Sequence, residues 1–247
     1  MYMTVQGIVL RVTDYNDRDA LLTLLTRRHG KLTVKARGLR RKNSPLIAPC
    51  QLLAYGEFTL FEYRGQYTIN EAHSIELFSQ LRRDLTKLSL GTYFAQAAEV
   101  LSQEDLPSPE LQSLVLNCLY ALSKLDLPEM QVKAVFELRA ACLSGYTPDL
   151  FGCHICGNQE PERFDLSSGQ LECRNCRSAE SRGIRMPVTP AVLEAMRYIC
   201  LCDPKKLFSF QIGKDTLETL SALTEAYLTT QLERGFSTLD FYKSLLI

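Results

Sequence analysis

Four cysteines in the second half of the chain are spaced like the ligands of a metal ion. Cys153 and Cys156 form one CxxC pair, Cys173 and Cys176 form a second, and sixteen residues separate the two pairs. One CxxC turn places two thiolates on one side of an ion, and a second turn completes a tetrahedral shell. The spacing therefore predicts one Zn²⁺ per chain. Four unrelated free cysteines, or a redox dithiol, are the alternatives.

The predicted zinc site is structural rather than catalytic. Four thiolates leave no open coordination position for a water molecule, and so short a segment has too little core to fold without the ion. His154 stands beside a ligand and is interpreted as a loop residue. The chain carries no GxxxxGK[ST], HExxH, GxGxxG or GxSxG motif, so we predict no catalytic residues and no enzyme activity.

A run of basic residues in the first quarter of the chain is the second chemical signal. The net charge is +7 over residues 1–56 and −7 over 57–247. Between residues 27 and 42 eight cations occur with no acid, and such a run repels itself unless an anion neutralises it. A solvated charged face is the alternative. We predict a polyanion-binding surface made of Arg27, Arg28, Lys31, Lys35, Arg37, Arg40, Arg41 and Lys42.

Aromatic residues near this run differ in their expected roles. Tyr15 falls in a polar turn, so it is the predicted base-stacking residue of the nucleic-acid site. Phe58, Phe61 and Tyr63 fall on a segment whose two faces are both largely apolar. We therefore expect these three side chains to pack in a core.

The elements that must position these residues change in type along the chain. Alternating or β-rich segments at about 5–12, 21–26, 32–36, 51–63 and 65–72 are separated by turn-rich stretches, which predicts five strands. Five strands without intervening helices favour a small barrel of the oligonucleotide-binding (OB) kind. An SH3-like barrel or a small sandwich is the alternative.

From about residue 75 the apolar period changes to that of helices. Helices are expected over about 111–125, 129–144, 190–202, 215–233 and 238–246. Ser108-Pro109, Thr189-Pro190 and Asp215 with Glu218 are predicted N-terminal signals. The predicted class is α+β and multidomain. An OB-fold nucleic-acid-binding domain at 1–78 precedes a helical domain at 79–247, which a zinc-binding segment at 150–187 interrupts.

Composition restricts the class of protein further. The chain has 247 residues, 46% of them apolar, and no apolar run long enough to cross a membrane. Its first residues lack the pattern of a secretory signal, and nine cysteines is an odd number. We therefore expect a cytoplasmic protein without disulfide bonds.

Several short segments resemble one family, the bacterial recombination mediator RecO. In the barrel the resemblance rests on Asp17-Arg18, on 26–32, on 35–41 and on Pro49. In the helical part it rests on Phe136-Glu137-Leu138-Arg139, on Leu143 and on Gly145-Tyr146-Thr147-Pro148-Asp149-Leu150, which leads directly into Cys153. The C-terminal segment 234–241 resembles the family's end but lacks its usual cations.

The resemblance implies a non-enzymatic DNA repair and recombination protein in the nucleoid. Such a protein binds single- and double-stranded DNA and anneals complementary strands. It acts with RecR, contacts the C-terminal tail of the single-stranded-DNA-binding protein SSB, and helps RecA replace SSB on single strands.

A zinc-ribbon protein that binds RNA or acts in transcription is the alternative function. Such a protein is expected to carry cations on its ribbon, whereas residues 160–185 hold five acids and five cations. The insert is therefore not the predicted anion site.

Overall fold

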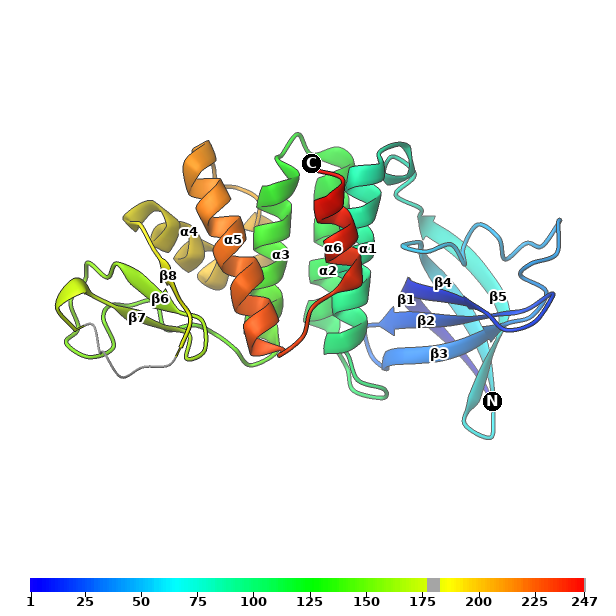
Figure 1. Cartoon of the computed structure of the whole chain (residues 1–247). Coiled ribbons are helices and arrows are strands. Elements are labelled where there is room, and N and C mark those ends of the chain that lie inside the picture. The colour runs from blue at the N-terminus through cyan, green and yellow to red at the C-terminus, as the bar shows by residue number, and fades with distance from the viewer. Residues whose placement is uncertain (177–182, 247) are drawn as a thin grey trace. The chain divides into compact units, whose positions relative to one another are not determined.

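The computed structural model describes residues 1–176 and 183–246, and its N-terminal part is a closed five-stranded barrel (Figure 1). The strands pair in the order β1-β2-β3-β5-β4, and β4 pairs with β1 to close the barrel. Only the β3–β5 pair is parallel. This is the arrangement of an OB fold, as the strand pattern predicted. The strands are β1 (Tyr2–Asp14), β2 (Ala20–Thr26), β3 (Gly30–Ala36), β4 (Tyr55–Tyr63) and β5 (Gln66–Glu76).

Side chains from all five strands fill the barrel with one apolar core. Val5 of β1, Leu22 of β2 and Phe58 of β4 are buried in it, with alternate residues pointing outward. The fourth strand begins at Tyr55, not at the predicted residue 51. Leu53 has a φ of +66°, a left-handed conformation that a strand does not contain. Residues 51–54 therefore form a turn.

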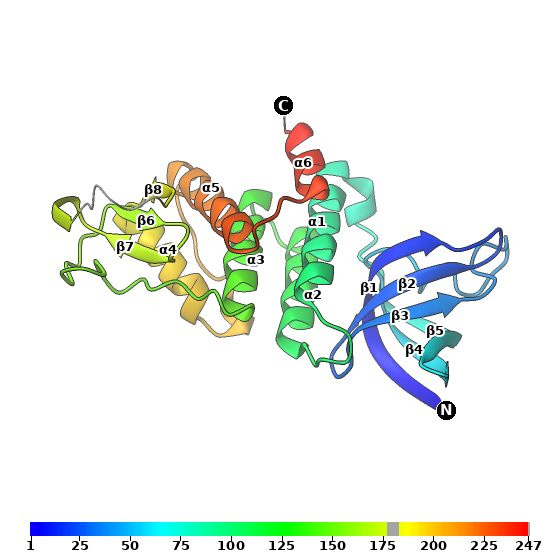
Figure 2. The same cartoon turned by 60° about the horizontal axis from the view of Figure 1, so that its bottom comes forward.

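Three helices join the barrel in a compact unit made of residues 1–125 and the C-terminal helix, which we call the barrel unit. They are α1 (Leu85–Leu101), α2 (Pro109–Lys124) and α6 (Ser237–Ser244), and the short 3₁₀ helix η1 (Leu81–Arg83) precedes α1. Helix α6 lies beside α1 (Figure 2), where the rings of Tyr93 and Phe236 are 5.4 Å apart. The boundary at residue 78 follows the last strand, and as a division between domains it stays a prediction.

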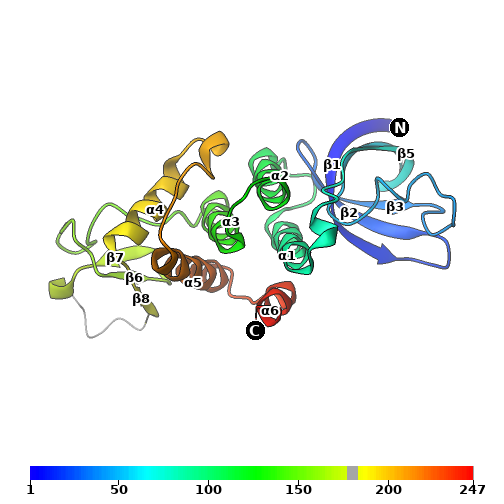
Figure 3. The same ribbon diagram turned by 90° about the horizontal axis from the view of Figure 1, so that it is seen from above.

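A second compact unit, the helical unit, spans residues 126–235. Helix α3 packs against α5 and α4 (Figure 3). The helices are α3 (Glu129–Leu143), α4 (Pro190–Leu201) and α5 (Lys214–Gln231), with the 3₁₀ helix η3 (Pro204–Lys206) between α4 and α5. Between α3 and α4 the chain forms a small sheet of order β7-β6-β8, made of β6 (Arg163–Asp165), β7 (Gln170–Glu172) and β8 (Arg185–Pro187).

The predicted helix signals differ in outcome. Thr189 caps α4, since its hydroxyl accepts the N–H of Val192, and Pro190 is the first helical residue. Ser108 precedes α2, but its hydroxyl donates to the carbonyl of Leu106 instead. The capping box at Asp215 is wrong, because α5 begins one residue earlier behind Gly213. Within the described residues, no helix is long and apolar enough to span a membrane.

Candidate nucleic-acid interface and metal centre

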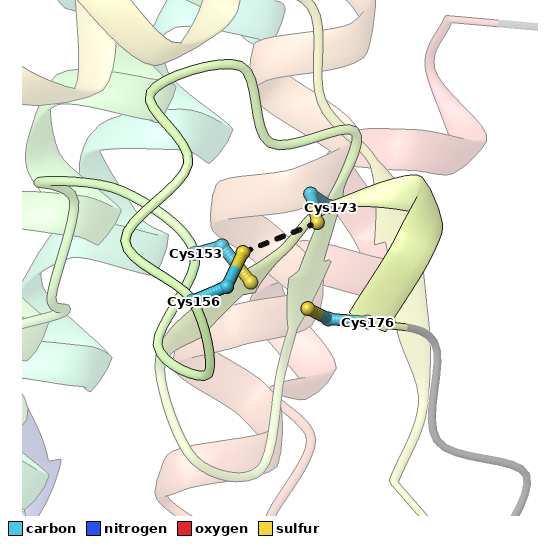
Figure 4. A group of neighbouring side chains, drawn as sticks. All are labelled: Cys153, Cys156, Cys173 and Cys176. Carbon is cyan, nitrogen blue, oxygen red and sulfur yellow. Dashed lines mark hydrogen bonds between the residues drawn. The ribbon is translucent and has the colours of Figure 1, made fainter.

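The four predicted zinc ligands come together at one end of the small sheet (Figure 4). Cys153 and Cys156 lie in the turn before β6, Cys173 follows β7, and Cys176 ends the 3₁₀ helix η2 (Arg174–Cys176). The first turn closes on itself, because the N–H of Gly157 donates to the carbonyl of Cys153 over 2.8 Å. It is attached to β7 through the N–H of His154, which donates to the carbonyl of Leu171.

The positions of the four sulfur atoms fit a tetrahedral metal site. All four Sγ atoms lie within 4.8 Å of one another, and those of Cys156 and Cys173 are 3.7 Å apart. In a tetrahedron with metal–sulfur bonds of about 2.3 Å, the sulfur atoms are about 3.8 Å apart. The cluster can therefore hold one metal ion with little rearrangement.

The pKa values of two thiols in the cluster are shifted in opposite directions. Burial raises the pKa of Cys153, but backbone N–H groups of Cys173, Cys156 and Ile155 stabilise its thiolate, and the pKa falls to about 6. Hydrogen bonds with the sulfur atoms of Cys156 and Cys173 raise the pKa of Cys176 to about 12. Four thiolates in one place repel one another, and a divalent cation at their centre removes that repulsion.

The described residues around the cluster carry charges of both signs, with Arg174 exposed between Cys173 and Cys176. His154 lies 3.7 Å from the carboxylate of Glu172 and outside the group of four sulfurs, in agreement with its interpretation as a loop residue. Arg185 of β8 pairs with Glu172 over 2.8 Å. The predicted even mix of charges includes Arg177, Glu180 and Arg182, which lie outside the described residues.

The basic run is divided between the two ends of the barrel. Arg27 and Arg28 lie in the turn between β2 and β3, and we call them the turn cluster. Strand β3 follows, and its seven residues cover about 20 Å. Arg37, Arg41 and Lys42 come after β3, in the long connection to β4, and we call them the loop cluster. The run is one segment in the sequence but two surfaces in space.

Three of the eight cations have partners in the fold. Lys31 donates to the carbonyl of Glu99, Lys35 pairs with Asp19, and Arg40 pairs with Asp14 over 3.3 Å. The expectation that the run has no internal neutralisation is therefore wrong for Lys35 and Arg40, because the end of β1 supplies Asp14 and the β1–β2 connection supplies Asp19. Among the described residues, no acid lies within ion-pair distance of the exposed side chains of Arg27, Arg28, Arg37, Arg41 and Lys42.

A network of hydrogen bonds holds the start of the loop. The carboxylate of Asp19 accepts the N–H of Gly38 over 2.9 Å, and Gly38 has a φ of +68° that favours glycine. This bond, together with the side chain of Asn16 and with Lys35, lowers the pKa of Asp19 below its usual value. The N–H of Arg40 donates to the carbonyl of Arg18. The β1–β2 connection thus fixes the backbone from which the loop cluster projects.

Tyr15 lies in the same connection and is exposed, as predicted. The ammonium group of Lys35 is 4.5 Å from the centre of its ring. An exposed ring beside a cation is suited to stacking on a base, and the stacking role of Tyr15 stays a prediction.

Comparison with known proteins identifies the family. Residues 82–240 match the family described as "Recombination protein O C terminal", and residues 1–78 match "Recombination protein O N terminal". The chain belongs to the RecO family. The "DNA repair protein RecO" of Acetivibrio thermocellus is 31% identical over 246 residues, covering 99% of this chain and 97% of that protein. The "DNA repair protein RecO" of Bacillus subtilis is 28% identical over 228 residues, and this alignment covers 92% of this chain and 88% of that protein.

Two aromatic residues that the sequence assigned to the core lie on the surface instead. Phe58 is fully buried, as expected, but 38% of Phe61 and 60% of Tyr63 are exposed. Both lie on the outer face of β4, because the alternate residues Phe58 and Leu60 point into the core. The turn residues Arg64-Gly65 directly after them are a signal that this end of the strand lies in solvent.

Proposed function

We propose that the barrel binds the phosphates of single- and double-stranded DNA without reading their sequence, and that the protein does so in DNA repair and recombination. The observation that carries this proposal is the set of exposed arginines and lysine with no acidic partner, above all in the loop cluster. Each phosphate that such a cation neutralises releases a condensed counterion, which favours binding at low salt. Membership of the RecO family supports the same role.

We infer that the protein anneals complementary strands without catalysing a chemical step. Annealing requires the repulsion between two polyanions to be screened while the base edges stay free. Cations that contact only the backbone meet this requirement, and cations at both ends of the barrel offer positions for two strands.

Titration of fluorescent DNA at several salt concentrations tests the proposal. Unrelated single strands and duplexes are expected to bind with similar affinity within each class, and log affinity is expected to fall linearly with log salt. Annealing of complementary oligonucleotides is measured in the same buffers. Binding that does not weaken with salt would contradict a phosphate-directed site.

We further propose that the four-cysteine cluster binds one Zn²⁺ that stabilises the insert. The ligands would be Cys153, Cys156, Cys173 and Cys176, and thiolates in a tetrahedron are the donors that zinc prefers. Because all four positions are protein ligands, the ion would supply folding energy only. Metal analysis of the purified protein is expected to give about one zinc per chain.

The family also supports a role with RecR and with the tail of SSB in helping RecA to load. We propose that the tail binds a groove of about 490 Å³ in the helical unit, where Tyr198, Leu201 and Phe210 are lining residues. Arg197 at its edge pairs with Glu194, and a carboxylate of the peptide would take the place of that acid. An acidic peptide with an apolar end fits such a groove.

Calorimetry with a peptide copy of the SSB tail tests this step. Leu201 is exposed on α4, so Leu201→Asp is expected to weaken the peptide at least tenfold without loss of folding. A Leu85→Asp variant on α1 is a matched control. Equal affinity of the two variants for the peptide would exclude this groove as its binding site. If the wild-type protein does not bind the peptide, the SSB tail is excluded as a partner.

A further inference from the structure

Three aromatic side chains are exposed together on the outside of the barrel. They are Tyr2 (61% exposed), Tyr63 (60%) and Phe61 (38%), and we call them the aromatic patch. Tyr2 lies directly opposite Phe61 in the β1–β4 register, with ring centres 5.1 Å apart. The guanidinium of Arg64 is 5.2 Å from the ring of Tyr63. Adjacent exposed rings of this size are typical of binding surfaces.

The aromatic patch continues into a groove that contains the turn cluster. Alternate strand residues share a face, so Tyr2, Thr4 and Gln6 all lie on the outside of β1, about 7 Å apart in succession. The groove has a volume of about 550 Å³. It is lined by Thr4, Val5, Gln6, Thr26, Arg27, Arg28, His29 and Glu57. One continuous face therefore joins exposed rings to two cations without acidic partners.

Among the described residues of the barrel unit, the helices leave this face exposed. From Gly7 to Leu10 every residue of β1 is buried, and α1 packs against the strand. Gln112 of α2 donates to the carbonyl of Gln6, and this contact marks the limit of the helices on β1. The side chains of Tyr2, Thr4 and Gln6 are exposed, and Figure 2 shows the start of β1 extending away from α1 and α2.

We propose that the outer face of β1 and β4 is a base-stacking site for single-stranded nucleic acid. The rings of Tyr2 and Tyr63 stack on bases, and Arg27 and Arg28 contact phosphates of the same strand. Aromatic platforms beside a cationic groove bind single strands of any sequence, because every base has a π face. A duplex keeps its base faces stacked, so the site distinguishes single strands from duplexes. The inference rests on the proposed DNA-binding function and goes beyond its phosphate contacts.

The chemistry of the groove favours a nucleic acid over a protein partner. The groove has two arginines that no acid among the described residues neutralises and a polar floor of Thr4 and Gln6, and a polyanion supplies the regularly spaced negative charges that such a surface lacks. Its one acid is Glu57, which pairs with Gln6 in the register, four residues from Phe61 along β4. The acid and the aromatic patch therefore lie at opposite ends of the floor.

A tryptophan at the patch reports directly on stacking. The chain contains no Trp, so Tyr63→Trp places the protein's single tryptophan on the patch. Oligothymidylate is expected to quench its fluorescence, and a duplex of the same length is not. Tyr120→Trp on the exposed surface of α2 is the control, with no quenching expected. Equal quenching at both positions, or none at position 63 while the oligonucleotide binds by anisotropy, would overturn the proposal.

Removal of the rings tests the contribution of stacking to affinity. A Tyr2→Ala, Tyr63→Ala variant is expected to lose at least about 30-fold in affinity for oligothymidylate, from about 1 kcal/mol or more for each of two stacked bases. Its duplex affinity and its salt slope are expected to be unchanged, since no phosphate contact is lost. Tyr2→Phe, Tyr63→Phe keeps the rings and is expected to bind normally.

The outcomes separate this inference from the proposed function. If the wild-type protein binds no DNA, the proposed function fails. If the wild type binds and the alanine variant binds single strands equally well, only the stacking site fails. A change of oligomeric state in the alanine variant, measured by sedimentation with affinity unchanged, would show that the patch joins two copies of the chain instead.

Discussion

The long connection after β3 and the cysteine-rich insert are both irregular segments with candidate ligands, but they are held in different ways. The connection is attached to a barrel with its own apolar core and is fixed by the bond between Asp19 and Gly38. The strands of the insert have three residues each, with few buried apolar side chains, among them Phe164 and Leu171. A segment with little core depends on a cross-link for its stability.

The difference shows which candidate ligands the fold requires. The side chains of Arg37, Arg41 and Lys42 point into solvent, so they can change without loss of structure. The four cysteines come together at one end of the insert's sheet, and under the proposed zinc site metal binding and folding of the insert are a single equilibrium. Substitutions in the two regions should therefore affect different measurements.

The largest effect is expected from loss of the cysteines. A Cys153→Ser, Cys176→Ser variant is expected to lose its metal and the fold of the insert, since structural zinc contributes on the order of 10 kcal/mol to such segments. Metal analysis and limited proteolysis of 150–187 measure both losses. Cys202→Ser, outside the cluster, is the control and is expected to keep the metal. Equal metal in the cysteine variant and the wild type would refute the site.

A smaller effect is expected from the core of the barrel. Leu22 is fully buried, so Leu22→Ala is expected to lower the free energy of unfolding by about 2–5 kcal/mol. Denaturant titration measures the change, and the metal content is expected to stay the same. A fall in metal content would show that the stability of the insert depends on the barrel core, which would contradict the independence of the two regions.

The smallest effect is expected at the hydrogen bond that fixes the loop. The pKa of Asp19 is lower in the folded protein than its unfolded value of 3.8. The ionised carboxylate therefore stabilises the folded protein fully above pH 3.8, and this stabilisation is lost as the pH falls through the pKa of the folded state. Asp19→Ala removes the carboxylate that accepts the N–H of Gly38. Faster amide exchange at Gly38 is expected in this variant and in acid, and Asp17→Ala is the control. Unchanged exchange at Gly38 would show that Asp19 does not hold the loop.

Local geometry decided which features the sequence could predict. CxxC spacing and the Thr189-Pro190 start of α4 follow from bond lengths and backbone angles within a few residues, and both are confirmed in place. The five strands, and hence a small barrel, were predicted from the alternation of apolar residues and from the turn residues between them. Five exposed cations were found because charge alone identifies them.

Features that depend on distant parts of the chain could not be predicted. The basic run is divided because β3 separates its two halves, and Lys35 and Arg40 are neutralised by acids that precede β2. Phe61 and Tyr63 are exposed because they lie on the face of β4 that points away from the barrel core. A segment that is apolar on both faces does not show which face the core covers.

Salt dependence of single-strand binding in a loop-cluster variant tests the central claim most directly. The loop variant carries three substitutions, Arg37→Glu, Arg41→Glu and Lys42→Glu, and keeps Arg40 with its ion pair to Asp14. The control variant has the same change in net charge at three exposed lysines outside the loop, Lys124→Glu, Lys205→Glu and Lys206→Glu. The loop variant is expected to lose affinity and annealing together, and its slope of log affinity against log salt to flatten by roughly 0.7 per lost contact. The control is expected to keep the wild-type slope. An unchanged slope in a folded loop variant would contradict phosphate binding at the loop cluster.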